Sequence, residues 1–99
     1  MSEHGPAVTV IEDGGPEDFL VRGRQDGEPV DVRLHVEPVS LSRWGLGHIA
    51  PREVVDVTMA YLLGHQRLDE LPPLVDLEEV AAAYDGFEAH LLERLGGRH

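Results

Sequence analysis

Cysteine is absent from the sequence, and only 5% of its 99 residues are aromatic. Without cysteine the chain has no disulfide framework, no thiolate metal site and no cysteine nucleophile. No apolar run is longer than five residues, whereas a helix that spans a bilayer needs roughly 20. The first residues show neither a basic segment nor an apolar stretch, so no signal peptide is expected. These absences predict a cytoplasmic protein without a membrane partner.

Positive charge is also scarce. Eight basic residues, all of them arginine, stand against 19 acidic ones, which gives a formal net charge of −11. Such a chain repels the phosphates of duplex nucleic acid and anionic lipid, and it has few aromatic residues for sheet-face RNA binding. The acidic surplus is explained by solubility alone, or it marks an antitoxin-like or nucleic-acid-mimicking partner of a basic protein.

A chain of 99 residues has room for one domain. We place this domain at residues 7–95, with disordered tails at 1–6 and 96–99, where glycine and polar residues are frequent. The core of so small a domain barely offsets the entropy lost when the chain is ordered. Association with a second copy would therefore help to stabilise it.

A β-hairpin is predicted around Asp26 and Gly27, because a type I′ turn needs two central residues with positive φ. The resulting register gathers apolar residues on one face of the two strands: Phe19, Val21, Val32 and Leu34. On the other face it pairs Arg22 with Asp31, Leu20 with Arg33, and Asp18 with His35. A slip of one residue would mix the two faces. A β-rich run at residues 8–11 adds a strand before the hairpin.

Helices are predicted to follow the hairpin. Pro51 suits the first position of a helix over Pro51–Leu63, which is apolar around most of its circumference. Such a helix lies at the centre of a fold or at an oligomer interface. After a linker at residues 68–75, Asp76 would cap the next helix, with Glu79 completing a capping box.

A break at Asp85-Gly86 precedes a last helix over Phe87–Leu95, with Asp85 as its cap. Together the elements predict an α+β fold. Its sheet would be a three-stranded antiparallel meander, with the third strand at the edge, packed on one face by two to three helices.

The hairpin register also suggests a binding face. Arg22, Arg24, Arg33 and His35 would project from the open side of the sheet. One interpretation is a small-molecule binder or an enzyme that uses these side chains on an anionic ligand. The alternative is that Asp31 and Asp18 pair with them within the sheet.

Signals for catalysis and metal binding are weak. The six histidines have none of the short spacings typical of metal sites, and none of the serines lies in a G-x-S-x-G context. The run Gly45-Leu46-Gly47-His48 lacks the third glycine and the lysine of a phosphate loop. No catalytic residue, metal ligand or cofactor is predicted.

Three residues are candidates for a protein interface. Trp44 beside Arg43 would be an exposed anchor or would fill a corner of the core, and Val55 and Met59 lie on the broadly apolar helix. We therefore expect a non-catalytic interaction or regulatory module, with a protein partner or a second copy as its ligand.

A resemblance supports the predicted layout. It rests on Ile49-Ala50-Pro51-Arg52-Glu53-Val54-Val55, then Ala60-Tyr61-Leu62-Leu63, Val75-Asp76-Leu77 and Tyr84. This half of the chain resembles a group of small uncharacterised bacterial proteins, in which a β-hairpin precedes a helical pattern PEELV…FLL…FDL…YFPEY. The chain departs from that pattern at Gly64-His65-Gln66 and at Asp85-Gly86. The resemblance implies an α+β layout and no particular activity.

Overall fold

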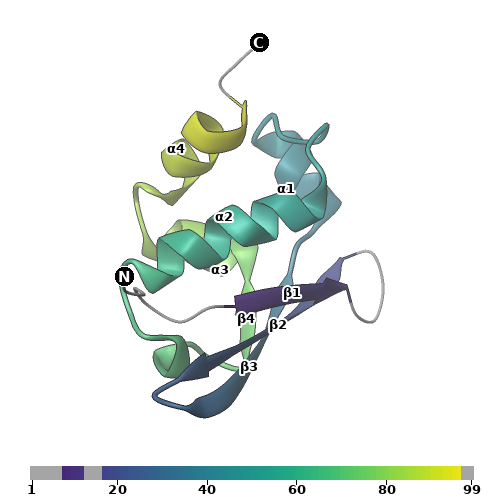
Figure 1. Cartoon of the computed structure of the whole chain (residues 1–99). Coiled ribbons are helices and arrows are strands. Elements are labelled where there is room, and N and C mark those ends of the chain that lie inside the picture. The colour runs from purple at the N-terminus through teal and green to yellow at the C-terminus, as the bar shows by residue number, and fades with distance from the viewer. Residues whose placement is uncertain (1–7, 13–16, 97–99) are drawn as a thin grey trace.

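The computed structural model describes residues 8–12 and 17–96, which form an α+β fold as predicted (Figure 1). The strands are β1 (Val8–Glu12), β2 (Asp18–Gln25), β3 (Glu28–His35) and β4 (Leu74–Asp76). The helices are α1 (Pro38–Arg43), α2 (Pro51–Leu63), α3 (Leu77–Ala83) and α4 (Phe87–Leu91). A 3₁₀ turn, η1 (Leu68–Glu70), precedes β4, and a π-helical turn, η2 (Leu92–Gly96), follows α4.

The predicted hairpin register is confirmed. Asp26 has a φ of 57° and Gly27 a φ of 83°, as a type I′ turn requires. The pairing runs from Gln25 opposite Glu28 through to Asp18 opposite His35 without a bulge, and β1 pairs antiparallel with the other side of β2. The apolar face of the hairpin is therefore turned to the core.

The predicted sheet was incomplete, because part of the expected linker at 68–75 forms a strand. β4 pairs in parallel with β3, which sets Leu34 beside Val75, so the sheet is four-stranded and mixed and β3 is not an edge. Arg33 N–H also donates to the carbonyl oxygen of Pro73 at 2.8 Å. A parallel neighbour needs a long crossover connection, which α1 and α2 supply, and a three-residue strand has too few positions to show a period of two.

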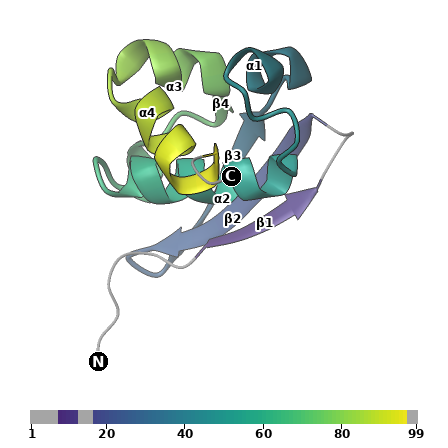
Figure 2. The same ribbon diagram turned by 90° about the horizontal axis from the view of Figure 1, so that it is seen from above.

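The helices lie on one side of the sheet, and α2 lies across it (Figure 2). The interior is built from both layers and includes Val21, Val32, Leu34, Val54, Leu62, Phe87 and Leu91. Val55 and Met59 also lie inside it, 0% and 1% exposed, so α2 is a central helix and a second copy cannot reach these two side chains. Trp44 is 8% exposed and fills the core, with the Arg43 guanidinium 5.9 Å from its ring centre.

The helix ends differ from the prediction in two details. Asp76 caps α3 by accepting a hydrogen bond from the backbone N–H of Glu78 at 2.9 Å, and the expected capping box with Glu79 does not form. The N-cap of α4 is Gly86 rather than Asp85, so no side chain caps this helix. Gly96, which the sequence placed in the tail 96–99, belongs to η2. The rest of that tail, 97–99, and the predicted tail 1–6 lie outside the described residues.

A matched pair of valines tests the core. Val32 is 1% exposed and Val39, on α1, is 62% exposed. Val32→Ala should lower the free energy of unfolding by about 2–3 kcal/mol, because buried methyl groups are lost and a cavity remains. Val39→Ala should change it by less than about 0.5 kcal/mol. Urea denaturation of both variants checks the assignment, and equal effects would contradict it.

Candidate functional site

The predicted arginine face exists, but its charges are engaged within the chain. Arg22 donates from Nε to Asp31 Oδ1 at 3.1 Å, and this hydrogen bond raises the pKa of the guanidinium. Arg24 donates to the carbonyl oxygen of Gly27 at 3.1 Å. Arg33 lies on the same face, one strand away and opposite Leu20. The face therefore holds the predicted cross-strand pairing, and a ligand-binding role for it stays a prediction.

A shallow hollow lies beside two of these arginines. It measures about 380 Å³ and is lined by Thr9, Arg22, Gly23, Arg24 and Pro29. Three of its five lining residues are uncharged and lack long side chains, so the two arginines supply all the charge of its lining. The hollow opens on the side of the sheet that faces away from the helices.

His35 lies among carboxylates rather than among cations. Its Nδ1 lies 3.0 Å from Asp18 Oδ1, and its Nε2 lies 3.5 Å from Glu37 Oε2 and 3.7 Å from Glu17 Oε1. The hydrogen bond with Asp18 is the main reason that the pKa of His35 is raised. The sequence predicted the partner Asp18 but not the two glutamates, of which Glu17 precedes β2 and Glu37 precedes α1. His35 thus fastens the start of β2 to the end of β3.

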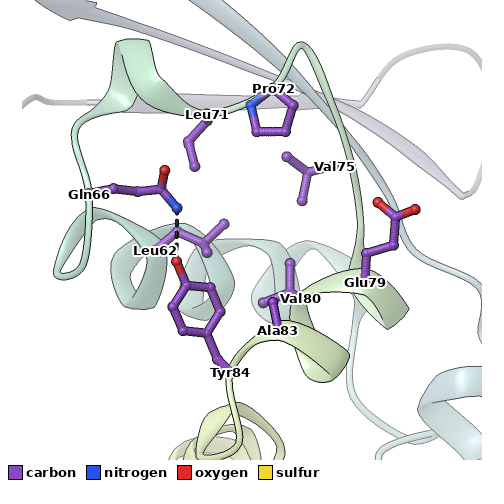
Figure 3. A pocket seen from close by; sticks show the side chains of 9 residues that line it. All are labelled: Leu62, Gln66, Leu71, Pro72, Val75, Glu79, Val80, Ala83 and Tyr84. Carbon is purple, nitrogen blue, oxygen red and sulfur yellow. Dashed lines mark hydrogen bonds between the residues drawn. The ribbon is translucent and has the colours of Figure 1, made fainter.

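An apolar groove opens on the helical side of the molecule (Figure 3). It lies between the C-terminal end of α2, the segment before β4, and α3, and it has a volume of about 190 Å³. Its lining is largely apolar and consists of Leu62, Gln66, Leu71, Pro72, Val75, Glu79, Val80, Ala83 and Tyr84. Concave, mostly apolar sites with a few placed polar groups are typical of binding sites.

Polar groups stand at opposite ends of this groove (Figure 3). At one end, Gln66 Nε2 donates to Tyr84 Oη at 2.9 Å, so the amide oxygen of Gln66 stays available as an acceptor. At the other end stands the carboxylate of Glu79. The Tyr84 hydroxyl, which accepts from Gln66, keeps its own O–H as a donor at that end. An apolar middle with a carboxylate at one end and an amide oxygen at the other suits a ligand with an apolar body and hydrogen-bond donors.

The two adjacent glutamates of α3 differ in their surroundings. Glu78 accepts hydrogen bonds from Ser40 and Arg43, which lower its pKa and fasten α3 to α1. Glu79 is exposed, and among the described residues its side chain makes no hydrogen bond or ion pair. The sequence assigned Glu79 to a capping box, and the structure instead leaves its carboxylate at the groove.

An aromatic cluster borders the groove, and sequence reasoning missed it. The ring of Tyr61 lies 4.5–5.6 Å from those of His65, Tyr84, Phe87 and His90. Tyr84 belongs to both the cluster and the groove. The spacing of Tyr61, on α2, and His65, two residues beyond its end, was a signal, since residues four apart share a helix face. The contacts with the later rings depend on tertiary packing.

The described residues contain no group of three metal-binding side chains that could hold an ion. Within the same ranges, no helix is both long and apolar enough to cross a bilayer. Comparison with protein-family models, with curated proteins and with solved structures finds no match to the chain. The resemblance to small bacterial proteins therefore stays a prediction.

His35 should make the stability of the protein depend on pH. Its pKa is raised in the folded state, so the stabilisation is fully present below the unfolded value of about 6.5 and is lost as pH rises through the folded value. His35→Gln should remove this part of the dependence. Urea denaturation between about pH 5.5 and pH 8.5 measures it.

The exposed His48 offers the matched control, because it makes no hydrogen bond or ion pair among the described residues. His48→Gln should keep the slope of the wild-type protein. The interpretation fails if His35→Gln and the wild-type protein lose the same stability across this pH range.

Proposed function

We propose that this chain is a non-catalytic interaction module, and that its apolar groove binds a basic, amphipathic segment of a partner protein. One bulky apolar side chain of the partner would occupy the groove, and a lysine or arginine beside it would pair with Glu79. The observation that carries the proposal is Glu79 itself, a carboxylate without a partner among the described residues at the end of an apolar groove.

The groove suits an anchoring side chain. Its volume of about 190 Å³ is below the usual range for drug-sized ligands of about 300–1,000 Å³. Leu62, Leu71, Val75 and Val80 give it an apolar wall, and all four are at most 8% exposed. A helix or extended segment that places one apolar residue in such a groove is a recurring mode of peptide recognition.

Charge favours a basic partner over an acidic or neutral one. The acceptors at the groove are Glu79 and the amide oxygen of Gln66, and the whole chain carries a net charge of −11. A field of this sign raises the association rate of a cationic segment and repels an anionic one.

Binding of a basic protein over the whole acidic surface is the second candidate, in the manner of an antitoxin or a nucleic-acid mimic. The net charge of −11 favours it. In that case affinity would fall steeply with salt, and a change inside the groove would have no effect.

Titration with synthetic peptides tests the groove. The probe carries one phenylalanine among lysines, and its counterpart carries glutamate in place of lysine. The amide NMR shifts of Leu62, Val80 and Tyr84, and the methyl shifts of Leu62 and Val80, should move with the lysine peptide only. Ala83→Leu should weaken binding at least about tenfold by filling the groove, and Glu79→Gln about two- to fivefold, as for one exposed ion pair.

Two matched variants control for changes of volume and charge. Ala82→Leu adds the same atoms to an exposed position of α3 outside the groove, and Glu93→Gln removes one exposed charge from η2. Both should bind like the wild-type protein. Equal binding by Ala83→Leu and Ala82→Leu would refute the groove and leave the acidic surface as the binding region.

A further inference from the structure

The sheet ends at β4, and the far side of this strand has no neighbouring strand among the described residues. The order of the sheet is β1-β2-β3-β4, with β4 paired to β3 alone. An edge strand presents unpaired backbone N–H and C=O groups, which can pair with a further extended segment. β4 is therefore a place where the sheet can accept a strand from a partner.

Leu74 provides the free backbone groups of β4. In a parallel pair, a residue bonds to the residues before and after the one that it faces. Arg33, which faces Leu74, donates its N–H to the carbonyl oxygen of Pro73, so the backbone N–H and C=O of Leu74 both point away from β3. Neither group has a hydrogen-bond partner among the described residues, and Leu74 is 58% exposed.

The edge at the other end of the sheet differs from β4. There β1 pairs with β2, and Arg52 of α2 donates to the carbonyl oxygen of Val10 at 3.1 Å. A helix side chain thus already occupies a backbone acceptor of β1. Of the two edge strands, β4 is better suited to accept another strand.

The free edge and the groove share one segment of chain. Val75 lines the groove, whereas Leu74 projects on the face of the sheet that is turned away from the helices, called here the outer face. Residues opposite one another in neighbouring strands project on the same face, at a strand spacing of about 4.8 Å. In an added strand, the residue opposite Val75 would therefore direct its side chain into the groove.

We propose that the basic segment of the partner binds in extended form, as a fifth strand antiparallel to β4, with its bulky apolar residue opposite Val75. This inference rests on the proposed function, because it concerns the same segment and the same groove. The residue after the apolar one would exchange two hydrogen bonds with Leu74, as a hydrogen-bonded antiparallel pair does. Main-chain bonds then contribute affinity and the groove selects the side chain.

The antiparallel direction also determines where the partner carries its charge. Residues before the apolar one lie towards the C-terminal end of β4, where α3 and Glu79 follow (Figure 3). Side chains two residues apart project on the same face of a strand, so a lysine or arginine two residues before the apolar one would reach Glu79. A helical segment would instead place this cation three or four residues away.

Peptides that are methylated on one backbone nitrogen test the added strand. The parent is a lysine-rich peptide with phenylalanine between two threonines, and its affinity is measured by NMR titration. Methylation of the threonine after phenylalanine removes the N–H that would donate to Leu74, and it should weaken binding at least about tenfold, because the methyl group also blocks the close approach. Methylation of the phenylalanine nitrogen is the matched control. Its N–H points away from β4, so the affinity should stay within about twofold of the parent.

Two variants at Leu74 test the same bonds from the side of the protein. Leu74→Pro removes an N–H that makes no bond within the sheet, and proline is tolerated at such an edge. Leu74→Ala removes the exposed side chain and keeps the N–H. Leu74→Pro should bind the parent peptide about threefold to tenfold more weakly than Leu74→Ala, and far-UV circular dichroism checks that both are folded.

The possible outcomes separate this inference from the proposed function. Equal affinities of the two methylated peptides, or of the two Leu74 variants, would overturn the added strand while binding at the groove stands. Absence of binding by the parent peptide would refute the proposed function, and the added strand with it.

Discussion

The turn at Asp26 and Gly27 holds the pairing of β2 with β3, and the division of the sheet into an inner and an outer face follows from that pairing. Both turn residues have positive φ, which suits a two-residue loop and fixes the register of the strands. Val21 and Val32 then face the helices, and Arg22 faces solvent beside Asp31. A shift by one residue would exchange the two sets, so both the core and the charge pattern of the outer face depend on this turn.

Three carboxylates at the start of α3, those of Asp76, Glu78 and Glu79, make different contacts. Asp76 caps α3, and Glu78 joins α3 to α1 through Ser40 and Arg43. Glu79 takes part in neither contact and borders the groove. Net charge alone does not distinguish these roles. The three side chains differ because the N-cap and the successive residues of the first helical turn project in different directions.

Local patterns predicted the hairpin, the central helix α2 and the pairing of Arg22 with Asp31. These features depend on turn chemistry and on periods of two and 3.6 residues, which a single sequence displays. β4 could not be predicted, because it has three residues and pairs with a strand far away in the chain. The groove and the cluster around Tyr61 were missed for the same reason. Both join side chains from segments that meet only after packing.

The parallel pairing of β3 with β4 also has a consequence for the order of assembly. It joins residues about 40 positions apart, and closing so long a loop costs more entropy than closing the two-residue turn of the hairpin. Sheets of this kind therefore acquire their local pairs before their distant ones. Because Val75 of β4 forms part of the groove wall, the groove exists only in a chain that has completed this distant pairing, whereas the hairpin can form before the second half of the polypeptide is synthesised.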